Sequence, residues 1–246
     1  MRVTSINAAT VRGAGPLYAQ VIDLITTRLA SGAWRPGQII PGESRLADEL
    51  QVSQGTVRKA VDELVARNLL VRQQGVGTFV AEHDSHRALF HFFHIVGADG
   101  ARLLPDSRVL RSTTVRATRE ESRALAIAAN ARVVRIERLR HLSEQPTILE
   151  TVSVAAKKFP GLCESKNIPN MLYAHYERDY GITIHRADEQ ITAEAAGTRA
   201  AQLLCCAPGD PLLKIVRVAW SLDDQPIELR VSRCLTTRHH YQNSIT

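Results

Sequence analysis

Two arginines and one glutamate occupy alternating positions in a stretch of sequence that has the pattern of paired β-strands. Between residues 134 and 142 every second residue is aliphatic except Arg138 and Arg140, so both arginines project on the face that the aliphatic residues bury. On the next predicted strand Glu150 is in phase with aliphatic neighbours in the same way. Charges on an apolar face are costly unless something pairs with them, which makes these three residues candidates for a binding site.

Two interpretations of these charges remain open. A ligand carboxylate or phosphate could bind the arginines, because the planar guanidinium group holds such anions through two parallel hydrogen bonds. Alternatively, Glu150 could form an ion pair with Arg138 or Arg140 and close the end of a barrel without any ligand. One arginine would remain without a partner in the second case, and this surplus charge favours the anionic ligand.

A second group of polar residues precedes an apolar helical pattern near the N-terminus. Ser53 is well placed to cap a helix that we expect from about Gln54 to Arg67, with apolar residues recurring on one face. A short polar first turn suits insertion into a DNA major groove, since small residues allow close approach, Gln and Arg reach base edges, and Lys reaches phosphate. The polar face of this helix starts with Gln54, Gly55, Thr56, Arg58 and Lys59.

The segments that flank this helix predict a winged helix-turn-helix. A short helical pattern around Leu46 and Leu50 precedes it, and two short strands at 69–72 and 78–80 follow it with a glycine-containing tip between them. DNA phosphates would lie along these segments, where basic residues gather. The residues expected to position the phosphates are Ser44, Arg45 and Arg72, together with Gln74, Gly75 and Gly77 of the ribbon tip.

The bulk composition is that of an ordinary soluble globular protein long enough for two modest domains. The chain has 246 residues, of which 44% are apolar and 23% charged. It contains no apolar run near the ~20 residues of a membrane span and no secretory signal. Its four cysteines lack CxxC spacing, so we expect a reducing cytoplasm. The net charge of +6 does not identify a DNA-binding half, because the first 84 residues hold nine Lys and Arg against eight Asp and Glu.

The change of pattern along the chain predicts two domains. We expect a mobile tail at 1–14, a DNA-binding domain at 15–80, a polar linker at 81–88 and a second domain at 89–246. The second domain has the pattern of a mixed α+β fold dominated by antiparallel strands. Its predicted strands are 89–96, 107–117, 131–142, 147–156, 182–193, 210–222 and 225–235, and its predicted helices are 118–129, 171–181 and 192–206.

A weak internal repeat occurs in the second domain. Residues 135–150 and 214–228 share the order basic-Ile-x-Arg-aliphatic, then Gln-Pro, then Glu, although one residue must be inserted to align them. Each copy would form a hairpin of two strands joined at a polar turn. Two such hairpins facing one another would create a cleft between them.

Histidine and cysteine pairs are weaker candidates for chemistry. His83 and His86 lie in the predicted linker, while His91 and His94 are three apart in a predicted strand and would point to opposite faces. The neighbouring Cys205 and Cys206 end an apolar helical pattern, where packing is a simpler explanation than redox sensing. The sequence therefore predicts neither a metal site nor a cofactor.

The N-terminal third resembles the DNA-binding domain of the GntR superfamily of bacterial transcription regulators. Residues 31–80 contain the PG, PGES, TVRKAVDEL and GVGTFV segments in the family order. Two positions depart from the usual pattern: Gln54 and Gly55 stand where relatives often have an Arg beside the helix cap, and Ser44 stands where some relatives have Arg. These differences concern the operator sequence rather than the DNA-binding role.

The remainder resembles the UTRA effector-binding domain of the HutC-type branch, which is similar in fold to chorismate lyase. The RIERLRHL…QPTILE, FPGL, LYAHYERDYGI, ADEQITAE, GDPLLKIVR and DDQPIE segments follow the family order. The resemblance implies that Met171 stands where relatives usually have a serine and Cys234 where they often have Tyr; both changes make the pocket more apolar and so favour a small organic acid over a sugar phosphate. The pocket residues implied by the resemblance are Arg138, Arg140, Glu150, Tyr173 and Glu228, with Cys234 in place of a frequent Tyr.

We therefore expect a ligand-responsive transcription regulator, with repression as the leading hypothesis. A homodimer would present two recognition helices to a pseudo-palindromic operator, and a small anionic metabolite would modulate binding. One alternative is chorismate-lyase-like enzyme activity, although no nucleophile–base pair supports turnover. Another is a constitutive DNA-binding protein whose second domain only dimerises, and a sizeable pocket containing both Arg138 and Arg140 would count against it.

Overall fold

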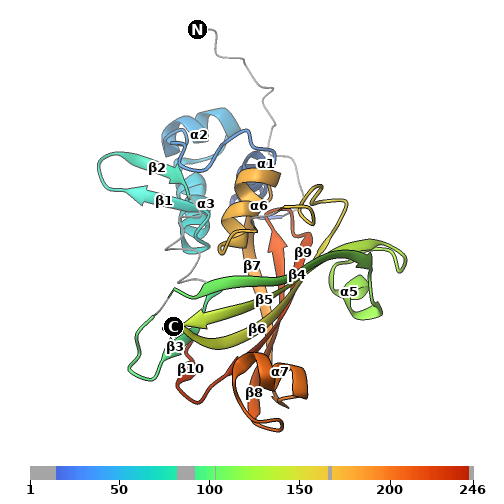
Figure 1. Ribbon diagram of the computed structural model, residues 1–246. Helices are drawn as coiled ribbons and strands as arrows, with labels where there is room; N and C mark the ends of the chain where they lie inside the picture. Colours follow the sequence, from blue (N-terminus) through green and yellow to red (C-terminus); the bar gives the residue numbers. More distant parts are fainter. Residues whose placement is uncertain (1–14, 82–91, 103, 166–167, 244–246) are drawn as a thin grey trace. The chain divides into compact units, whose positions relative to one another are not determined.

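The computed structural model describes residues 15–81, 92–102, 104–165 and 168–243. The chain divides into two compact units between residues 83 and 84, and each is considered separately. The N-terminal unit is mainly helical and the C-terminal unit is built on an antiparallel sheet (Figure 1), which confirms the predicted α+β class. The predicted tail at 1–14 and all of the predicted linker except Ala81 lie outside the described residues.

The N-terminal unit packs its helices around a small apolar core. Helix α3 contacts both other helices through residues that are almost fully buried, such as Val57 and Leu64. The antiparallel strands β1 and β2 pair Leu70 with Val80 and complete the predicted winged helix-turn-helix. The elements are α1 (Leu17–Ala30), α2 (Glu43–Leu50), α3 (Gln54–Ala66), β1 (Leu70–Gln73) and β2 (Gly77–Val80).

The tip of this ribbon depends on glycine. Gly75 has a φ of +74° and Gly77 a φ of +147°, which are backbone conformations that other residues rarely adopt. A Cβ at Gly77 would lie 2.8 Å from the Cδ1 atom of Ile39, a residue that bridges to Phe79 at the edge of the ribbon. The two glycines therefore allow the turn and the close packing of the ribbon against the preceding segment.

The C-terminal unit contains, in its described residues, a six-stranded antiparallel sheet with the order β4-β5-β6-β9-β8-β7. Two short strands outside this sheet, β3 near the start of the C-terminal unit and β10 near its end, pair with each other. The strands are β3 (Ile95–Gly97), β4 (Asp106–Arg116), β5 (Arg132–Leu142), β6 (Gln145–Ala155), β7 (Ile184–Ala195), β8 (Pro211–Ser221), β9 (Pro226–Leu235) and β10 (His239–Tyr241). The helices are α5 (Arg119–Ala124), α6 (Leu172–Tyr180) and α7 (Thr198–Leu204).

The two faces of this sheet are covered by different helices. Helix α6 packs on one face, where Tyr176 joins Val134, Ile136, Val152 and other apolar residues in one core. Helices α5 and α7 pack on the opposite face. Their apolar clusters contain strand residues such as Leu139 and Leu229, which alternate along the strands with the residues under α6. Alternation in the strands thus decides which side chains lie under α6, and Arg138, Arg140 and Glu150 are among them.

Three predictions of local structure were wrong in part. The repeated hairpins do not face each other: β5–β6 and β8–β9 lie side by side in one sheet because β6 pairs with β9. The predicted helix at 192–206 begins only at Thr198, because residues 192–195 extend the edge strand β7. Strand β3 covers only the end of the predicted strand 89–96, whose first three residues lie outside the described part.

Candidate functional site

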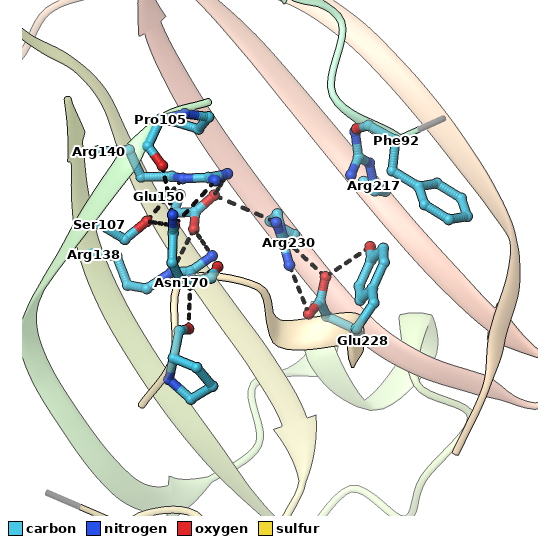
Figure 2. Close-up of polar contacts among 12 residues, drawn as sticks. Phe92, Pro105, Ser107, Arg138, Arg140, Glu150, Asn170, Arg217, Glu228 and Arg230 are labelled. Carbon is cyan, nitrogen blue, oxygen red and sulfur yellow. Dashed lines mark hydrogen bonds and ion pairs between the residues drawn. The ribbon is translucent and has the colours of Figure 1, made fainter. Parts of the chain in front are cut away.

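Charged side chains from four adjacent strands are buried together on the sheet face that α6 covers (Figure 2). Strand β5 contributes Arg138 and Arg140, β6 contributes Glu150, and β8 contributes Arg217. Strand β9 adds Glu228 and Arg230 in the same phase, so these six side chains share one surface of the sheet. Each of the six residues is at most 9% exposed, so each charge needs a partner close to it, and the four arginines outnumber the two glutamates.

Arg138 is held by Glu150 and by backbone carbonyls. Its Nε donates to Glu150 Oε1 at 2.5 Å, and its Nη1 donates to the backbone carbonyl of Asn170 at 3.1 Å. Burial would by itself raise the pKa of Glu150, but the charges of Arg138, Arg230 and Arg140 hold that pKa well below its usual range. Glu150 therefore stays ionised, and the Arg138–Glu150 pair is a fixed part of the structure.

Arg230 connects the two glutamates because of the strand register. It lies directly opposite Val152 in the β6–β9 pair, and Glu150 and Glu228 each lie two residues away on the same face. Its guanidinium donates to both oxygens of Glu228, at 2.8 and 3.0 Å, and lies 3.7 Å from Glu150 Oε2. Figure 2 shows this bridge between the two carboxylates.

Helix α6 satisfies the remaining capacity of Glu228. The hydroxyl groups of Tyr173 and Tyr176 donate to its two oxygens at 3.1 and 2.9 Å. Burial, together with the nearby charge of Glu228, raises the pKa of Tyr173 to about 12, so the phenol remains a hydrogen-bond donor at neutral pH. This helix ends at Gly181 in the left-handed conformation, as its sequence pattern predicts.

Arg140 is the least well paired arginine of the cluster. Its nearest carboxylate contact, with Glu150 Oε2, is 3.7 Å long, and its Nε donates to the neutral hydroxyl of Ser107 at 3.0 Å. Burial lowers the pKa of Arg140 to about 10, and the attraction of Glu150 offsets this only in part. Its guanidinium also lies over the ring of Phe93, 5.2 Å from the ring centroid. Arg140 thus remains a buried cation with incomplete compensation.

A cavity of about 40 Å³ lies beside Arg140. The apolar part of its lining comes from Phe92 and Phe93 and from the start of α6, where the ring of Phe92 meets Tyr173 edge-on with centroids 5.1 Å apart. Arg217 anchors this wall, since it donates to the backbone carbonyl of Phe92. The lining residues are Phe92, Phe93, Arg140, Asn170, Met171, Leu172, Tyr173, Arg217 and Arg230.

A larger cleft of about 730 Å³ shares Phe92 and Arg217 with this cavity. Arg217 pairs there with Glu189 at 2.7 Å, and the hydroxyl of Tyr241 donates to the other oxygen of Glu189 at 2.6 Å. The ring of His94 stacks at a tilt on Tyr241, and burial lowers the pKa of this histidine. Phe92 and Arg217 therefore form the partition between a small charged cavity and a wide polar cleft.

The structure separates the predicted pocket residues into two groups. Arg140 and Tyr173 line the cavity, whereas Arg138, Glu150 and Glu228 are not part of its lining and belong to the charged network around it. Cys234 is also not part of the lining: it is buried in an apolar cluster with Ile148, and burial raises the pKa of its thiol to about 12.

Sequence reasoning missed several residues of this region. Arg217 occupies the position of Arg138 in the internal repeat, so the repeat itself was the signal that could have identified it. Arg230 is two residues from Glu228 in a predicted strand and therefore on the same face. The same alternation had identified Arg138 and Arg140, so it could have identified Arg230. The predicted strand 89–96 gave no indication that Phe92 and Phe93 would line a site, and Asn170 had no signal; all three lie outside the named helices and strands. Within the described residues no group of three or more His, Cys, Asp or Glu is arranged to hold a metal, and His83, His86 and His91 lie outside them.

The first turn of α3 in the N-terminal unit is exposed and locally ordered by its cap. The hydroxyl of Ser53 accepts from the backbone N–H of Thr56 at 3.2 Å and contacts the Thr56 hydroxyl at 2.8 Å. The predicted DNA-contacting residues around this turn and at the ribbon tip are exposed or partly exposed, and Lys59 lies over the ring of Tyr18 at 3.9 Å. The exposed members are Ser44, Arg45, Ser53, Gln54, Gly55, Arg58, Lys59, Arg72, Gln74 and Gly75, with Thr56 and Gly77 half-buried.

One carboxylate joins the three elements of this surface. Glu43 at the start of α2 accepts from Arg58 of α3 at 2.9 Å and from Arg72 of β1 at 2.7 Å. Arg72 also contacts Asp62 at 2.5 Å. Because Arg58 and Arg72 are 60% and 43% exposed, both guanidinium groups remain accessible to an external anion.

An exposed helix-turn-helix with a ribbon, combined with a second unit that encloses a charged cavity, defines the class of ligand-responsive DNA-binding regulators. Two family models match the chain: "Bacterial regulatory proteins, gntR family" over residues 17–80 and "UTRA domain" over residues 101–240. The chain belongs to the GntR family of bacterial transcription regulators and carries a UTRA domain. As such a regulator it binds DNA operators through the first unit and small-molecule effectors through the second.

Similar proteins and solved structures support the assignment to this family. The chain is 32% identical to the histidine utilization repressor of Pseudomonas putida over 220 residues, covering 89% of this chain and 88% of that protein. It is 29% identical to the transcriptional repressor NagR of Bacillus subtilis, covering 83% and 84% of the two chains. These relatives are regulators, so the comparisons support the regulator hypothesis and not the enzyme alternative.

Two crystal structures share the fold. The ligand-binding domain of a GntR-family regulator from Bordetella bronchiseptica is 33% identical, with a TM-score of 0.57, and covers 63% of this chain and 97% of its own. PhnF from Mycobacterium smegmatis is 26% identical, with a TM-score of 0.56, and covers 92% and 99%. Within the described part of this chain, no helix has the length and apolar character that crossing a membrane requires.

Proposed function

We propose that the protein is a cytoplasmic repressor that binds a pseudo-palindromic operator as a homodimer and responds to a small anionic metabolite. The names of the relatives above, which are repressors, support the sign of regulation. We assign the DNA-binding domain to residues 15–80, following a tail at 1–14, and the effector domain to 89–246, with 81–88 as the linker. The base-reading residues in this proposal are Gln54, Gly55, Thr56 and Arg58, and the phosphate-positioning residues are Ser44, Arg45, Lys59, Arg72 and the ribbon tip.

The incomplete pairing of Arg140 is the observation that supports an anionic effector. Within the described residues around the cavity, four buried arginines meet three glutamates, and Arg140 is the one whose nearest carboxylate is as far as 3.7 Å. A single carboxylate on the effector would balance the surplus charge and could form two parallel hydrogen bonds with the guanidinium group. The cluster consists of the buried residues Arg138, Arg140, Arg217, Arg230, Glu150 and Glu228 with the half-buried Glu189.

The remaining lining supports a small organic acid rather than a sugar phosphate. Met171, the residue before α6, lines the cavity with Arg140 and offers no hydroxyl group, and Phe92, Phe93 and Tyr173 add aromatic surface. Arg217 and Arg230 of the lining are already paired with Glu189 and Glu228, so apolar walls beside the one incompletely paired cation, Arg140, suit a ligand with a single carboxylate and a flat or aliphatic body. A phosphorylated sugar would require more donors than this lining leaves free, since Arg217, Arg230 and Tyr173 already bond to carboxylates.

Phe92 and Phe93 connect effector binding to the DNA-binding unit in this proposal. A cavity of about 40 Å³ is far smaller than the several hundred Å³ of typical ligand pockets. Displacing Phe92 would join the cavity to the adjacent cleft and supply the missing volume. Since both residues directly follow the segment that leads from the DNA-binding unit, an effector that favours the displaced arrangement would change operator affinity.

A screen with the full chain tests the proposal. Small carboxylates and phosphates would be added to the purified protein, and the thermal shift and the retention of promoter fragments flanking its own gene would be measured. We expect a carboxylate to stabilise the protein and to release DNA, and we expect Arg140→Gln to bind DNA without responding. Arg199→Gln, an exposed arginine on α7 that pairs with Glu137, is the matched control and should respond normally. Equal DNA affinity with and without every stabilising compound would contradict the proposal.

A further inference from the structure

Arg217 holds the backbone of Phe92 in the wall between the charged cavity and the polar cleft. Its Nη2 atom donates to the backbone carbonyl oxygen of Phe92, and Figure 2 shows the two residues side by side. Phe92 is 8% exposed, and its ring packs edge-on against Tyr173. Both the main chain and the side chain of Phe92 are therefore fixed, and Arg217 fixes the main chain.

The guanidinium group of Arg217 has a second anchor that does not involve Phe92. Its Nε donates to Glu189 Oε1 at 2.7 Å, and its Nη2 lies 2.5 Å from the same oxygen. The hydroxyl of Tyr241 donates to the other oxygen of Glu189 at 2.6 Å and so holds this carboxylate in place. If Phe92 moved away, Glu189 would keep the guanidinium group where it is.

Displacement of Phe92 would leave a buried donor without its acceptor. Arg217 is 9% exposed, and a buried N–H group that loses its partner is costly. An effector that displaced Phe92 but bound only Arg140 would leave this cost in place, whereas an effector with a second acceptor would remove it. Arg140 and Arg217 line the same cavity of about 40 Å³, so the two acceptors can belong to one small molecule.

We infer that the effector carries, besides its carboxylate, a neutral hydrogen-bond acceptor that takes the place of the Phe92 carbonyl on Arg217. The carboxylate would bind Arg140, and a ketone, amide or ester oxygen would bind Arg217. The second acceptor is neutral because Glu189 already balances the charge of Arg217. The inference rests on the proposed function and adds the chemical feature that separates a compound that releases DNA from one that only binds.

Two pairs of acids that differ only in this acceptor test the inference on the full chain. Levulinate and para-acetylbenzoate each carry a ketone, whereas isocaproate and para-isopropylbenzoate have nearly the same shape with a methyl group in place of the ketone oxygen. Gel shifts with promoter DNA would measure the concentration of each acid that releases the protein, and thermal shifts would record binding. We expect each ketone to release DNA at a concentration about tenfold or more below that of its methyl counterpart.

Removal of the donor should abolish this difference. In Arg217→Met the two acids of a pair should release DNA at similar concentrations, and the affinity for DNA without any acid should fall about tenfold because Phe92 is no longer held. Arg217→Lys keeps a positive charge beside Glu189 and should narrow the difference in the same way, which provides a second variant if Arg217→Met does not fold. The matched control is Arg233→Gln, which removes another arginine–glutamate pair to β7, with Glu194, and should behave like the wild type.

The possible results separate this inference from the proposed function. Equal potency of the two acids in both pairs, or a difference that persists in both Arg217 variants, would overturn the inference alone. Loss of the difference in Arg233→Gln, or a carboxylate of the wider screen that releases DNA without any second acceptor, would also overturn it. If no carboxylate of that screen releases DNA from the wild-type protein, the proposed function fails and the inference fails with it.

Discussion

The arginines of the two units pair with carboxylates at similar distances but differ in their access to solvent. Arg58 contacts Glu43 at 2.9 Å with 60% of its side chain exposed, whereas Arg138 contacts Glu150 at 2.5 Å with 1% exposed. In water the first pair can exchange its carboxylate for a phosphate at little cost, because surface ion pairs are weak. The second pair cannot open without leaving charges in an apolar environment. Exposure, and not the distance between the charges, distinguishes the binding surface from the internal framework.

Removing the buried carboxylate should have the largest effect. Glu150→Gln leaves Arg138, Arg140 and Arg230 without their common partner, so we expect the free energy of unfolding to fall by about 3–5 kcal/mol. Urea denaturation followed by circular dichroism would measure the change. A loss below about 1 kcal/mol would show that this cluster behaves like the surface pairs and would remove the contrast between the two units.

Acid should weaken the C-terminal unit through a second buried carboxylate. Burial would raise the pKa of Glu121, but hydrogen bonds from Arg135, the Thr118 backbone and Ser153 lower it to about 2. Because the folded pKa lies below the unfolded one, the stabilisation is present above about pH 4.5 and is lost as the pH falls toward 2. We expect about 3 kcal/mol to be lost in this window.

Comparison with Glu121→Gln isolates this contribution from that of other carboxylates. The wild type and the variant would be unfolded with urea at several pH values between 2 and 6. Their difference in unfolding free energy should shrink steadily as the pH falls. A difference that stays constant over this range would assign no pH dependence to Glu121.

Truncating an exposed arginine should affect DNA binding and leave stability almost unchanged. If Arg58 reaches a guanine edge, Arg58→Ala should weaken operator binding by about 1–3 kcal/mol. The free energy of unfolding should change by less than about 0.5 kcal/mol, because the side chain is exposed. Gel shifts with operator DNA and urea denaturation measure the two quantities, and unchanged operator affinity would refute the base-reading assignment.

A small effect on stability is also expected at Glu43. Glu43→Gln breaks contacts with two exposed arginines, so the unfolding free energy should change by at most about 1 kcal/mol. The loss of a negative charge beside the phosphates should strengthen binding to random DNA and release Arg58 and Arg72 from their fixed positions. The ratio of operator to random-DNA affinity should therefore fall in competition gel shifts, and an unchanged ratio would limit Glu43 to a structural role.

Local patterns predicted much of this molecule correctly because they depend on neighbouring residues. The cap at Ser53, the αL end of α6 at Gly181 and the alternation that buries Arg138, Arg140 and Glu150 are all present in the structure. The helix predicted at 192–206 was too long because pairing with β8 keeps residues 192–195 in the edge strand. Tertiary pairing overrode helix propensity there.

The amino-acid sequence alone determined which residues are charged, which face of a strand each occupies and where the main helices begin and end. These features follow from neighbouring residues and from the repeat of side-chain directions, every two residues in a strand and every 3.6 in a helix. Only the tertiary structure decided which strands are adjacent. The pairing of β6 with β9, about 80 residues apart, places Arg230 between Glu150 and Glu228 and leaves Arg140 with the weaker partner. Periodicity assigns a side chain to a face but not to a neighbour, because the neighbour depends on how distant strands pack together.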